Sequence, residues 1–284
     1  MQSPVIINIW RGNLRICQLQ LQQGQIGNSK KKMSNSYFQF KQFTIHQDRC
    51  AMKVTTDGCL FGAWAAERVG SSETGVRSRE SLAGSILDIG TGTGLLSLMI
   101  AQHCTADITT VEIDTESFEQ ASDNISASPW ADRIKIFHAD VREFEFSKQY
   151  DVIMSNPPFY EKELKTDDAK KNIARHNEGL LLPKLLTIIK KNLKPDGIFF
   201  LLLPFKRNEE IRKLLTESDL TIQQLTCVRQ STNHDFFRIM LAGKLKTGES
   251  VETKIDDISI KDEQEQDQYT QAFADLLKNY YLHL

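Results

Sequence analysis

The feature that most constrains the fold is an alternation of short apolar runs with helical stretches, which starts near residue 85. Runs of strand length predict strands at residues 85–89, 108–111, 134–137, 152–155, 198–203, 223–228 and 236–242. Stretches with helical spacing lie between them at residues 95–103, 117–125, 181–193 and 209–217. Such repetition implies right-handed parallel crossovers. We therefore expect an α/β fold, with a doubly wound, mostly parallel seven-stranded sheet covered on both faces.

The C-terminal part of the pattern is different. A polar segment at residues 229–235 joins the last two predicted strands without a helix, so they are expected to pair antiparallel at one edge of the sheet. Apolar residues at helical spacing predict a further helix at residues 268–281, with its apolar stripe packed on the core.

The charge of the chain is balanced but unevenly distributed. Lys and Arg number 35 against 37 Asp and Glu, so a nucleic-acid partner cannot be inferred from the net charge of −2. No acid precedes Asp48, and the N-terminal side is the candidate face for a polyanion. Residues 1–33 are rich in Gln and end in a basic run. We interpret them as a flexible extension, or as a misassigned upstream frame with Met33 as the start, before a domain at residues 34–284.

Cysteine usage favours a reducing compartment. The five cysteines are scattered and form no C-x-x-C pair, so we expect free thiols, a cytoplasmic location and no zinc. The six histidines show no ligand spacing, and no metal is expected. The longest apolar run, residues 198–205, is too short to span a bilayer, and no secretion signal is apparent.

Residues 88–94, D-I-G-T-G-T-G, follow the first predicted strand and open a helix. Their glycines permit a tight turn and a close approach of a ligand to the backbone. A dinucleotide fingerprint requires G-x-G-x-x-G, but Gly94 comes one residue early, which disfavours NAD. A carboxylate at Asp88 would repel phosphate and attract a cation. The pattern favours S-adenosylmethionine, with Asp88, Gly90, Gly92 and Gly94 as cofactor-binding residues.

Acidic residues also follow the next two predicted strands. Glu112 comes about twenty residues after the glycine loop, where an acid can accept hydrogen bonds from both ribose hydroxyls. Asp140 stands where an adenine amino group would need an acceptor, although a helix N-cap is the alternative interpretation. Because open α/β sheets bind ligands at the carboxyl ends of their strands, the three acids together predict a cofactor site there.

Residues 156–159, N-P-P-F, follow the fourth predicted strand. The prolines fix φ and leave Asn156 extended in a rigid loop that presents acceptors. The Asn156 side-chain oxygen and the Pro157 carbonyl can each accept one N–H of a planar amine and stabilise positive charge as a methyl group is transferred. Phe159 can stack on the base. The alternative is a turn that ends the strand and buries a phenylalanine.

Taken in this order, D-I-G-T-G-T-G, V-E-I-D, A-D-V and N-P-P-F resemble the motifs of class I S-adenosylmethionine-dependent amino-methyltransferases. The resemblance covers residues 34–284 and implies a Rossmann-like fold. A narrower resemblance, to bacterial tRNA (adenine(37)-N6)-methyltransferases that modify a valine tRNA, lies in residues 40–43, 48–64, 128–131 and 269–273.

The narrower resemblance implies N6-methylation of an adenine in the anticodon loop, with Lys53, Thr55 and Asp57 closing over the cofactor. From the residues alone, positions 56–58 are only a turn or N-cap signal. The N-P-P-F loop is also similar to that of ribosomal RNA guanine-N2 and adenine-N6 enzymes, and many relatives, among them the glutamine methyltransferases of release factors, have tyrosine where Phe159 stands. Adenine, guanine and glutamine thus stay open as targets of this loop.

An anticodon-loop base must leave its stack to react, which a single-stranded loop permits at low cost. Local cations are expected to contact the phosphates of the tRNA. The candidates are Lys30, Lys31, Lys32, Lys41, Arg49, Arg175, Lys206, Arg207 and Arg229.

Overall fold

The computed structural model describes residues 35–69, 84–158, 181–248, 252–262 and 268–284. The chain divides after residue 34 into two units, and the second, Asn35–Leu284, is the one considered below. Residues 1–34 lie outside the described part, so the N-terminal extension stays a prediction.

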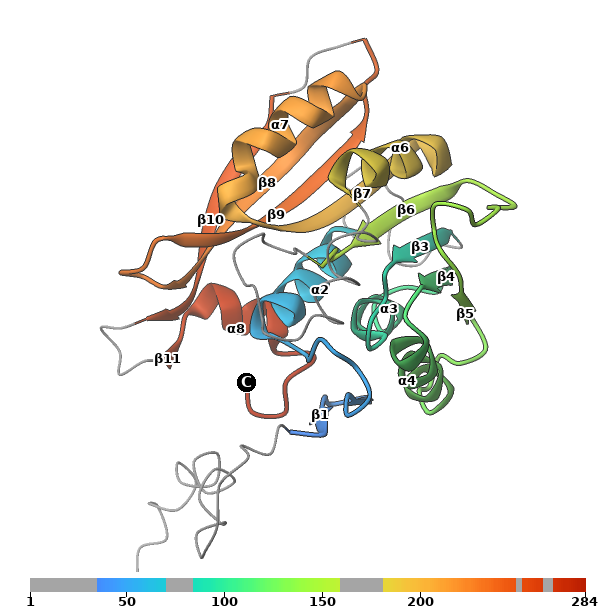
Figure 1. Ribbon diagram of the computed structural model, residues 1–284. Coiled ribbons are helices and arrows are strands. Elements are labelled where there is room, and N and C mark those ends of the chain that lie inside the picture. The colour runs from blue at the N-terminus through green and yellow to red at the C-terminus, as the bar shows by residue number, and fades with distance from the viewer. Residues whose placement is uncertain (1–34, 70–83, 159–180, 249–251, 263–267) are drawn as a thin grey trace, which may run out of the picture. The chain divides into compact units, whose positions relative to one another are not determined.

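Strands β1 (Tyr37–Gln39) and β2 (Thr44–His46) form a separate two-stranded sheet, and nine further described strands, two more than predicted, form one sheet in the order β11-β10-β8-β9-β7-β6-β3-β4-β5 (Figure 1). Their bounds are β3 (Ser85–Ile89), β4 (Asp107–Glu112), β5 (Ile134–His138), β6 (Tyr150–Ser155), β7 (Leu193–Pro204), β8 (Leu220–Ser231), β9 (Phe236–Leu245), β10 (Lys254–Asp262) and β11 (Gln268–Tyr269). Strands β5, β4, β3, β6 and β7 pair parallel. All seven predicted strands are present, and the expected α/β class with a mostly parallel sheet is confirmed.

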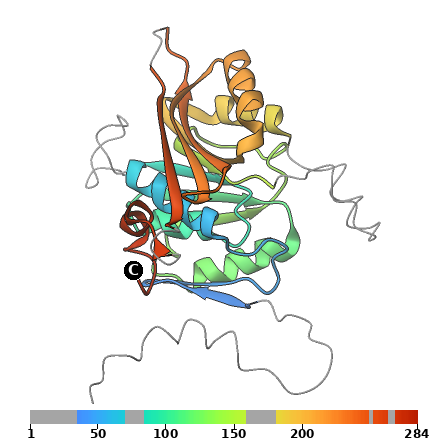
Figure 2. The same cartoon turned by 90° about the vertical axis from the view of Figure 1, so that its left-hand side faces the viewer.

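Helices cover both faces of the sheet (Figures 1 and 2). A first core contains residues of α2 (Thr56–Val69), α3 (Leu95–Ala101) and α8 (Gln271–Leu277), and a second core contains residues of α6 (Leu182–Asn192) and α7 (Asn208–Glu217). Helix α4 (Thr115–Ser126) contacts β4 and β5. Strand β7 contributes to both cores, because its side chains alternate between the two faces of the sheet. Phe200 enters the first core, whereas Phe199 and Leu201 enter the second.

The predicted antiparallel pairing of the last two strands is confirmed for β8 and β9. Their predicted place at the edge is wrong, because β10 pairs parallel with β8 and β11 pairs antiparallel with β10. Strand β10 contains several acidic residues, and one of them, Asp256, has partners on the neighbouring strand. Asp256 accepts a hydrogen bond from Gln224 Nε2 at 2.7 Å and another from Thr226 Oγ1, while Ile258 and Ile260 are buried on the first core.

The predicted C-terminal helix is shorter than expected. Residues 268–269 belong to β11, and Thr270 caps the helix by accepting a hydrogen bond from Phe273 N at 3.3 Å, so α8 begins at Gln271. Its buried residues, Phe273 and Leu277, pack on the first core as the apolar stripe predicts.

The segment after α8 ties both ends of the described unit to the first core. The Tyr280 hydroxyl donates to the Met99 carbonyl at 2.9 Å, near the end of α3, where helix carbonyls lack partners of their own. Tyr281 bridges to Phe40, which follows β1 and precedes β2. The tail therefore closes the core and satisfies a buried acceptor.

Replacement of Tyr280 by phenylalanine is expected to lower the free energy of unfolding by about 1–3 kcal/mol, because a buried carbonyl loses its donor. Tyr37→Phe serves as the matched control: its ring is 44% exposed, and we expect a change within about 0.5 kcal/mol. Urea unfolding followed by circular dichroism measures both variants. Equal stability of Tyr280→Phe and the wild-type protein would contradict this account.

Candidate active site

The glycine loop joins β3 to α3 at the carboxyl end of the sheet. Gly90, Gly92 and Gly94 have positive φ values of 71°, 57° and 85°, which only glycine adopts without strain. A Cβ at Gly90 or Gly92 would meet no atom within 4 Å, so these two residues leave open space beside the backbone. The loop therefore presents the bare main chain that the spacing predicted.

Asp88 is fully buried on the α3 side of β3. Its Oδ2 atom accepts hydrogen bonds from Thr91 Oγ1 at 2.7 Å and from Ser97 Oγ at 2.8 Å. Among the described residues, its Oδ1 atom has no partner although it is buried. Burial raises the pKa of Asp88 from 3.8 to about 6, and the two hydroxyls only partly offset the loss of water. A positively charged group at Oδ1 would satisfy this carboxylate.

Glu112 ends β4 and is 7% exposed. One of its oxygens accepts from Gly92 N at 2.8 Å, and the other accepts from the backbone amides of Ile113 and Asp114, each at 2.9 Å. The oxygen bound by Gly92 N retains a second lone pair for a hydroxyl donor, whereas the other oxygen already accepts twice. The side chain thus holds the glycine loop in place, a role that the sequence pattern did not indicate.

Asp140 follows β5 and begins a turn. Its carboxylate accepts a hydrogen bond from Arg142 N at 2.9 Å, but no helix follows in this described segment, so the alternative interpretation as a helix N-cap is wrong. Its carboxylate also receives two hydrogen bonds from Arg142 Nε at 2.8 Å. This guanidinium lowers the pKa of Asp140 below its usual value. The acid is charged, half-buried and already paired.

Asn156 and Pro157 follow β6, next to the glycine loop. Ser155 pairs with Ile89 across the two strands, and the Ser155 hydroxyl donates to the Ile89 carbonyl at 2.7 Å, which ties the two loops together. Pro157 is buried and Asn156 is half-buried. Phe159, the third predicted catalytic residue, lies outside the described residues.

The segment that enters α2 carries three further predicted residues. Thr55 caps α2, because its Oγ1 atom accepts a hydrogen bond from Gly58 N at 3.2 Å, so a helix begins here as the N-cap signal indicated, with its cap one residue before positions 56–58. Asp57 forms an ion pair with Arg238 of β9 at 2.8 Å. Lys53 donates to the carbonyl of Gln47. A Cβ on Gly58 would lie 3.5 Å from Leu95, so the start of α2 lies beside the end of the glycine loop.

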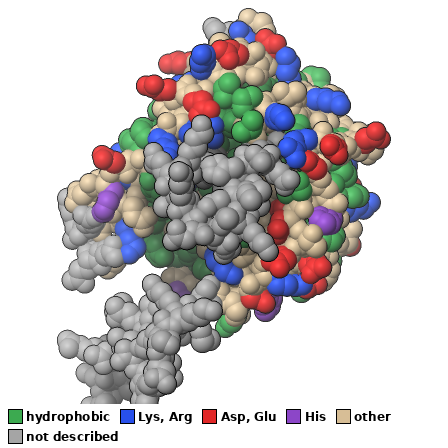
Figure 3. Space-filling model, viewed as in Figure 1, with side chains coloured by type: hydrophobic (Ala, Val, Ile, Leu, Met, Phe, Trp, Pro, Cys, Tyr) green, Lys and Arg blue, Asp and Glu red, His purple; other side chains and the backbone are tan. Residues whose placement is uncertain are grey.

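The predicted RNA-contacting cations have protein partners where they are described. Arg49 pairs with Asp123, Arg207 with Glu210, and Arg229 with Asp257. Lys and Arg side chains are interspersed with Asp and Glu on the described surface in Figure 3. Arg175 and Lys30 to Lys32 lie outside the described residues. Charge alone therefore does not mark an RNA surface on the face shown.

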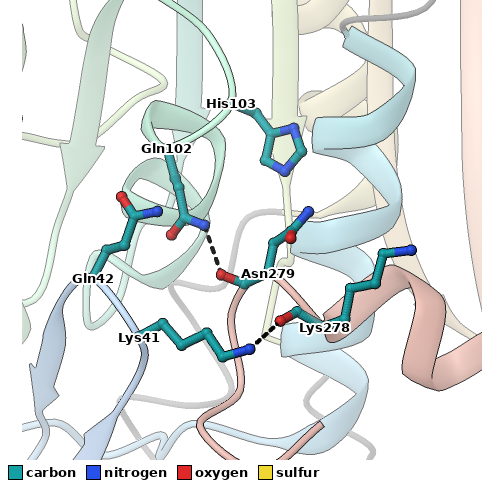
Figure 4. A pocket seen from close by; sticks show the side chains of 6 residues that line it. All are labelled: Lys41, Gln42, Gln102, His103, Lys278 and Asn279. Carbon is teal, nitrogen blue, oxygen red and sulfur yellow. Dashed lines mark hydrogen bonds between the residues drawn. The ribbon is translucent and has the colours of Figure 1, made fainter.

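Two hollows open elsewhere on the described surface. One, of about 420 Å³, is lined by Lys41, Gln42, Gln102, His103, Lys278 and Asn279 (Figure 4). The other, of about 580 Å³, is lined by Gly84, Ser85, Lys148, Gln149, Asp151 and Lys194. Neither includes a predicted catalytic or cofactor-binding residue. Within the described ranges, no three His, Cys, Asp or Glu side chains gather as a metal site would require, and no helix is long and apolar enough to cross a membrane.

The fold is shared with known methyltransferases. The structure of a predicted O-methyltransferase from Agrobacterium tumefaciens matches 78% of this chain and 96% of its own, with a TM-score of 0.55 and 15% identity. A putative class I S-adenosylmethionine-dependent methyltransferase from Listeria monocytogenes matches 72% of this chain and 68% of its own, with a TM-score of 0.54 and 13% identity. At these identities the likeness concerns the fold alone.

Sequence comparison gives the family. Residues 75–213 match the family model of the methyltransferase small domain. A protein of Phocaeicola vulgatus named tRNA1(Val) (adenine(37)-N6)-methyltransferase is 40% identical over 89% of this chain and 100% of its own length. A protein of the same name from Dyadobacter fermentans is 40% identical over 87% of this chain and 98% of its own. The chain belongs to the family of tRNA1(Val) (adenine(37)-N6)-methyltransferases.

Proposed function

We propose that this chain transfers a methyl group from S-adenosylmethionine to N6 of adenine 37 in the anticodon loop of a valine tRNA. The observation that carries the proposal is the proximity of Asp88, Glu112 and Asn156. They lie at or directly after the carboxyl ends of three neighbouring parallel strands, β3, β4 and β6. The relatives' shared name supports the choice of substrate.

The residues at the edge of the sheet fit the cofactor. The buried Oδ1 atom of Asp88 suits the ammonium of the amino-acid part, and the Glu112 oxygen bound by Gly92 N has a lone pair left for a ribose hydroxyl. The open space beside Gly90 and Gly92 admits a ligand against the main chain. When bound, S-adenosylmethionine supplies an electrophilic methyl group on a sulfonium. Gly94, which opens α3, and Asp140 complete this proposed set, Asp140 as an acceptor that Arg142 keeps ionised.

The start of α2 forms the proposed cover of the cofactor. Thr55 fixes the first turn of α2, and Asp57 anchors that turn to β9 through Arg238. Lys53 holds the preceding segment through the Gln47 carbonyl. In the proposal these three residues act by positioning, because each has a protein partner beside Leu95 and the glycine loop.

Asn156 and Pro157 provide the chemistry on the adenine. The exocyclic nitrogen is a poor nucleophile because its lone pair is conjugated with the ring. Two acceptors, the Asn156 side-chain oxygen and the Pro157 carbonyl, would bind its two N–H groups, favour a pyramidal nitrogen and stabilise the positive charge that develops. Fixed orientation supplies much of the remaining rate. The product ammonium is acidic enough to lose its proton to water, so no general base is needed. Phe159 is proposed to stack on the base.

Asp88→Asn tests the cofactor site, because we expect it to stabilise the cofactor-free protein relative to wild type as the pH rises, and to weaken the binding of S-adenosylmethionine. Because the folded pKa, about 6, exceeds the usual 3.8, the unfolding free energy of the cofactor-free wild type should fall as pH rises from about 4 to above 6. The variant lacks this decline, so its stability relative to wild type should rise by roughly 2–3 kcal/mol across that range. Its affinity for S-adenosylmethionine should fall about tenfold or more, because a charge-assisted bond is lost.

Thermal unfolding from pH 4 to pH 8 and titration calorimetry measure these two effects. Asp123→Asn, at an exposed acid of α4 paired with Arg49, is the control and should change neither. Unchanged cofactor affinity in Asp88→Asn would remove Asp88 from the proposed site.

Asn156→Ala is expected to leave S-adenosylmethionine binding nearly unchanged and to lower kcat by about 10²-fold or more, the loss seen when one charge-stabilising group is removed. Single-turnover methylation of an unmodified valine tRNA transcript measures the rate. Turnover at the wild-type rate would reject the acceptor mechanism.

The substrate is tested in cells by mass spectrometry of nucleosides from a deletion strain. We expect N6-methyladenosine to be missing from one valine tRNA, and to be restored by the wild-type gene but not by Asn156→Ala. Intact tRNA together with a missing methyl group in ribosomal RNA or in a release factor would overturn the proposed substrate.

A further inference from the structure

Arg238 lies level with the N-P-P-F loop at the active-site edge of the sheet. Ser155, the last residue of β6, pairs with Leu201 of β7, and Pro204, the last residue of β7, pairs with Arg238 of β9, so Arg238 and the loop after β6 both lie at the carboxyl end of the parallel strands. Strand β7 lies between β6 and β9, so two strand spacings, roughly 10 Å, separate the strand that carries Arg238 from the strand that leads into Asn156. This separation is of the order of the span between the amino edge of an adenine and the phosphate of the same nucleotide.

Arg238 faces the first-core side of the sheet. Met240 enters the first core, and alternation along β9 places Arg238, two residues away, on the same side. The partner of Arg238 agrees with this, since Asp57 belongs to α2, which covers the first core. Met154 of β6 enters the same core, and Asn156 follows directly after β6 ends at Ser155, so the guanidinium stands on the side where the glycine loop and α2 lie.

A β-bulge next to Arg238 shapes this place. Val228 pairs with Arg238 and Arg229 pairs with Phe236, so Phe237 is the extra residue of the bulge. The bulge turns Phe237 onto the first core, and the Arg238 Cζ atom lies 5.3 Å from the centre of its ring. Phe236 packs on the second core, and Arg229 covers its ring at 4.1 Å.

The contacts of Arg238 leave donors for a ligand. Its Nε atom donates to Asp57 Oδ2 at 2.8 Å, and its Nη1 atom donates to the Phe237 carbonyl at 3.4 Å. A guanidinium has five N–H donors, so within the described structure the terminal Nη edge retains capacity for an anion. The side chain is 32% exposed, whereas Asp57 is 14% exposed. Asp57 therefore holds the guanidinium from the protein side while its outer edge is open to solvent.

Resting on the proposed function, we propose that Arg238 binds the phosphate of the nucleotide whose base enters the active site, with Asp57 and Phe237 orienting the guanidinium. An arginine suits this task because its planar fork matches phosphate oxygens and its charge does not titrate. Arg238 is a substrate-positioning residue in this proposal, and the ligand is a phosphodiester of RNA.

The salt dependence of RNA binding tests the proposal. For the wild type and Arg238→Gln, the Kd for an unmodified valine tRNA transcript is measured from low to physiological salt. Loss of one phosphate contact should lower the slope of log K against log salt by about 0.7–0.9 and weaken binding most at low salt. Arg238→Lys keeps the charge and should keep the slope. Arg212→Gln, at an arginine of α7 that bonds Asn208, is the matched control and should bind like wild type.

A structural role for the ion pair predicts a different result. Arg238→Gln and Asp57→Asn would then both melt at a lower temperature with the wild-type salt slope, and this outcome would overturn the proposal. A lowered slope in Arg229→Gln together with an unchanged slope in Arg238→Gln would overturn it too, because the RNA would then run over the second-core face. Methylation of the same transcript by the wild type is scored separately, and its absence would contradict the proposed function rather than the role of Arg238.

Discussion

A carboxylate buried at the end of a central strand is the constraint on which the site depends. Asp88 is withdrawn from water with one oxygen bound by two hydroxyls and the other without a described partner. Such a group destabilises an empty fold, and the surrounding packing must offset it. In the proposed function this loss of stability is offset when the ammonium of the cofactor binds to the unpaired oxygen. The neighbouring Glu112, by contrast, accepts hydrogen bonds from three backbone amides, one of them from the glycine loop, and holds that loop in place before any ligand arrives.

The periodic part of the chain could be predicted because parallel strands buried on both faces read as short, continuous apolar runs. Strand β10 could not be predicted in this way, because it contains polar side chains whose partners come from another strand. Asp256 has the character of a surface acid in the sequence, but in the fold it accepts hydrogen bonds from Gln224 and Thr226 of β8. The end of the C-terminal helix was missed for a similar reason. Apolar spacing continues to Tyr280, but the last of these residues pack from a turn rather than from a helix.

The sequence predicts the types of residue at the proposed site, but only some of the hydrogen bonds and ion pairs that hold them. Spacing and turn chemistry indicate the glycines, Asp88 and a turn or N-cap at residues 56–58, one residue after the cap that Thr55 forms. No local pattern indicates that Ser155 ties the two loops together or that Asp57 meets Arg238 across 181 positions, because both contacts arise from strand register and from the packing of α2. The family model covers residues 75–213, so the helix that carries Asp57 and the strand that carries Arg238 lie outside the shared methyltransferase part. The proposed cover of the cofactor and the proposed phosphate contact therefore lie in these flanking parts, whereas Asp88, Glu112 and Asn156 lie within the shared part.

The bridge between Phe40 and Tyr281 has a consequence for synthesis of the chain. Phe40 and Phe43 stack on each other at 4.5 Å and need the C-terminal segment to complete their burial. When all strands of the central sheet have been synthesised, this aromatic surface still lacks its contact with Tyr281, which lies near the C-terminus. The nascent chain therefore carries an exposed apolar face through most of translation, which is the kind of surface that holding chaperones bind.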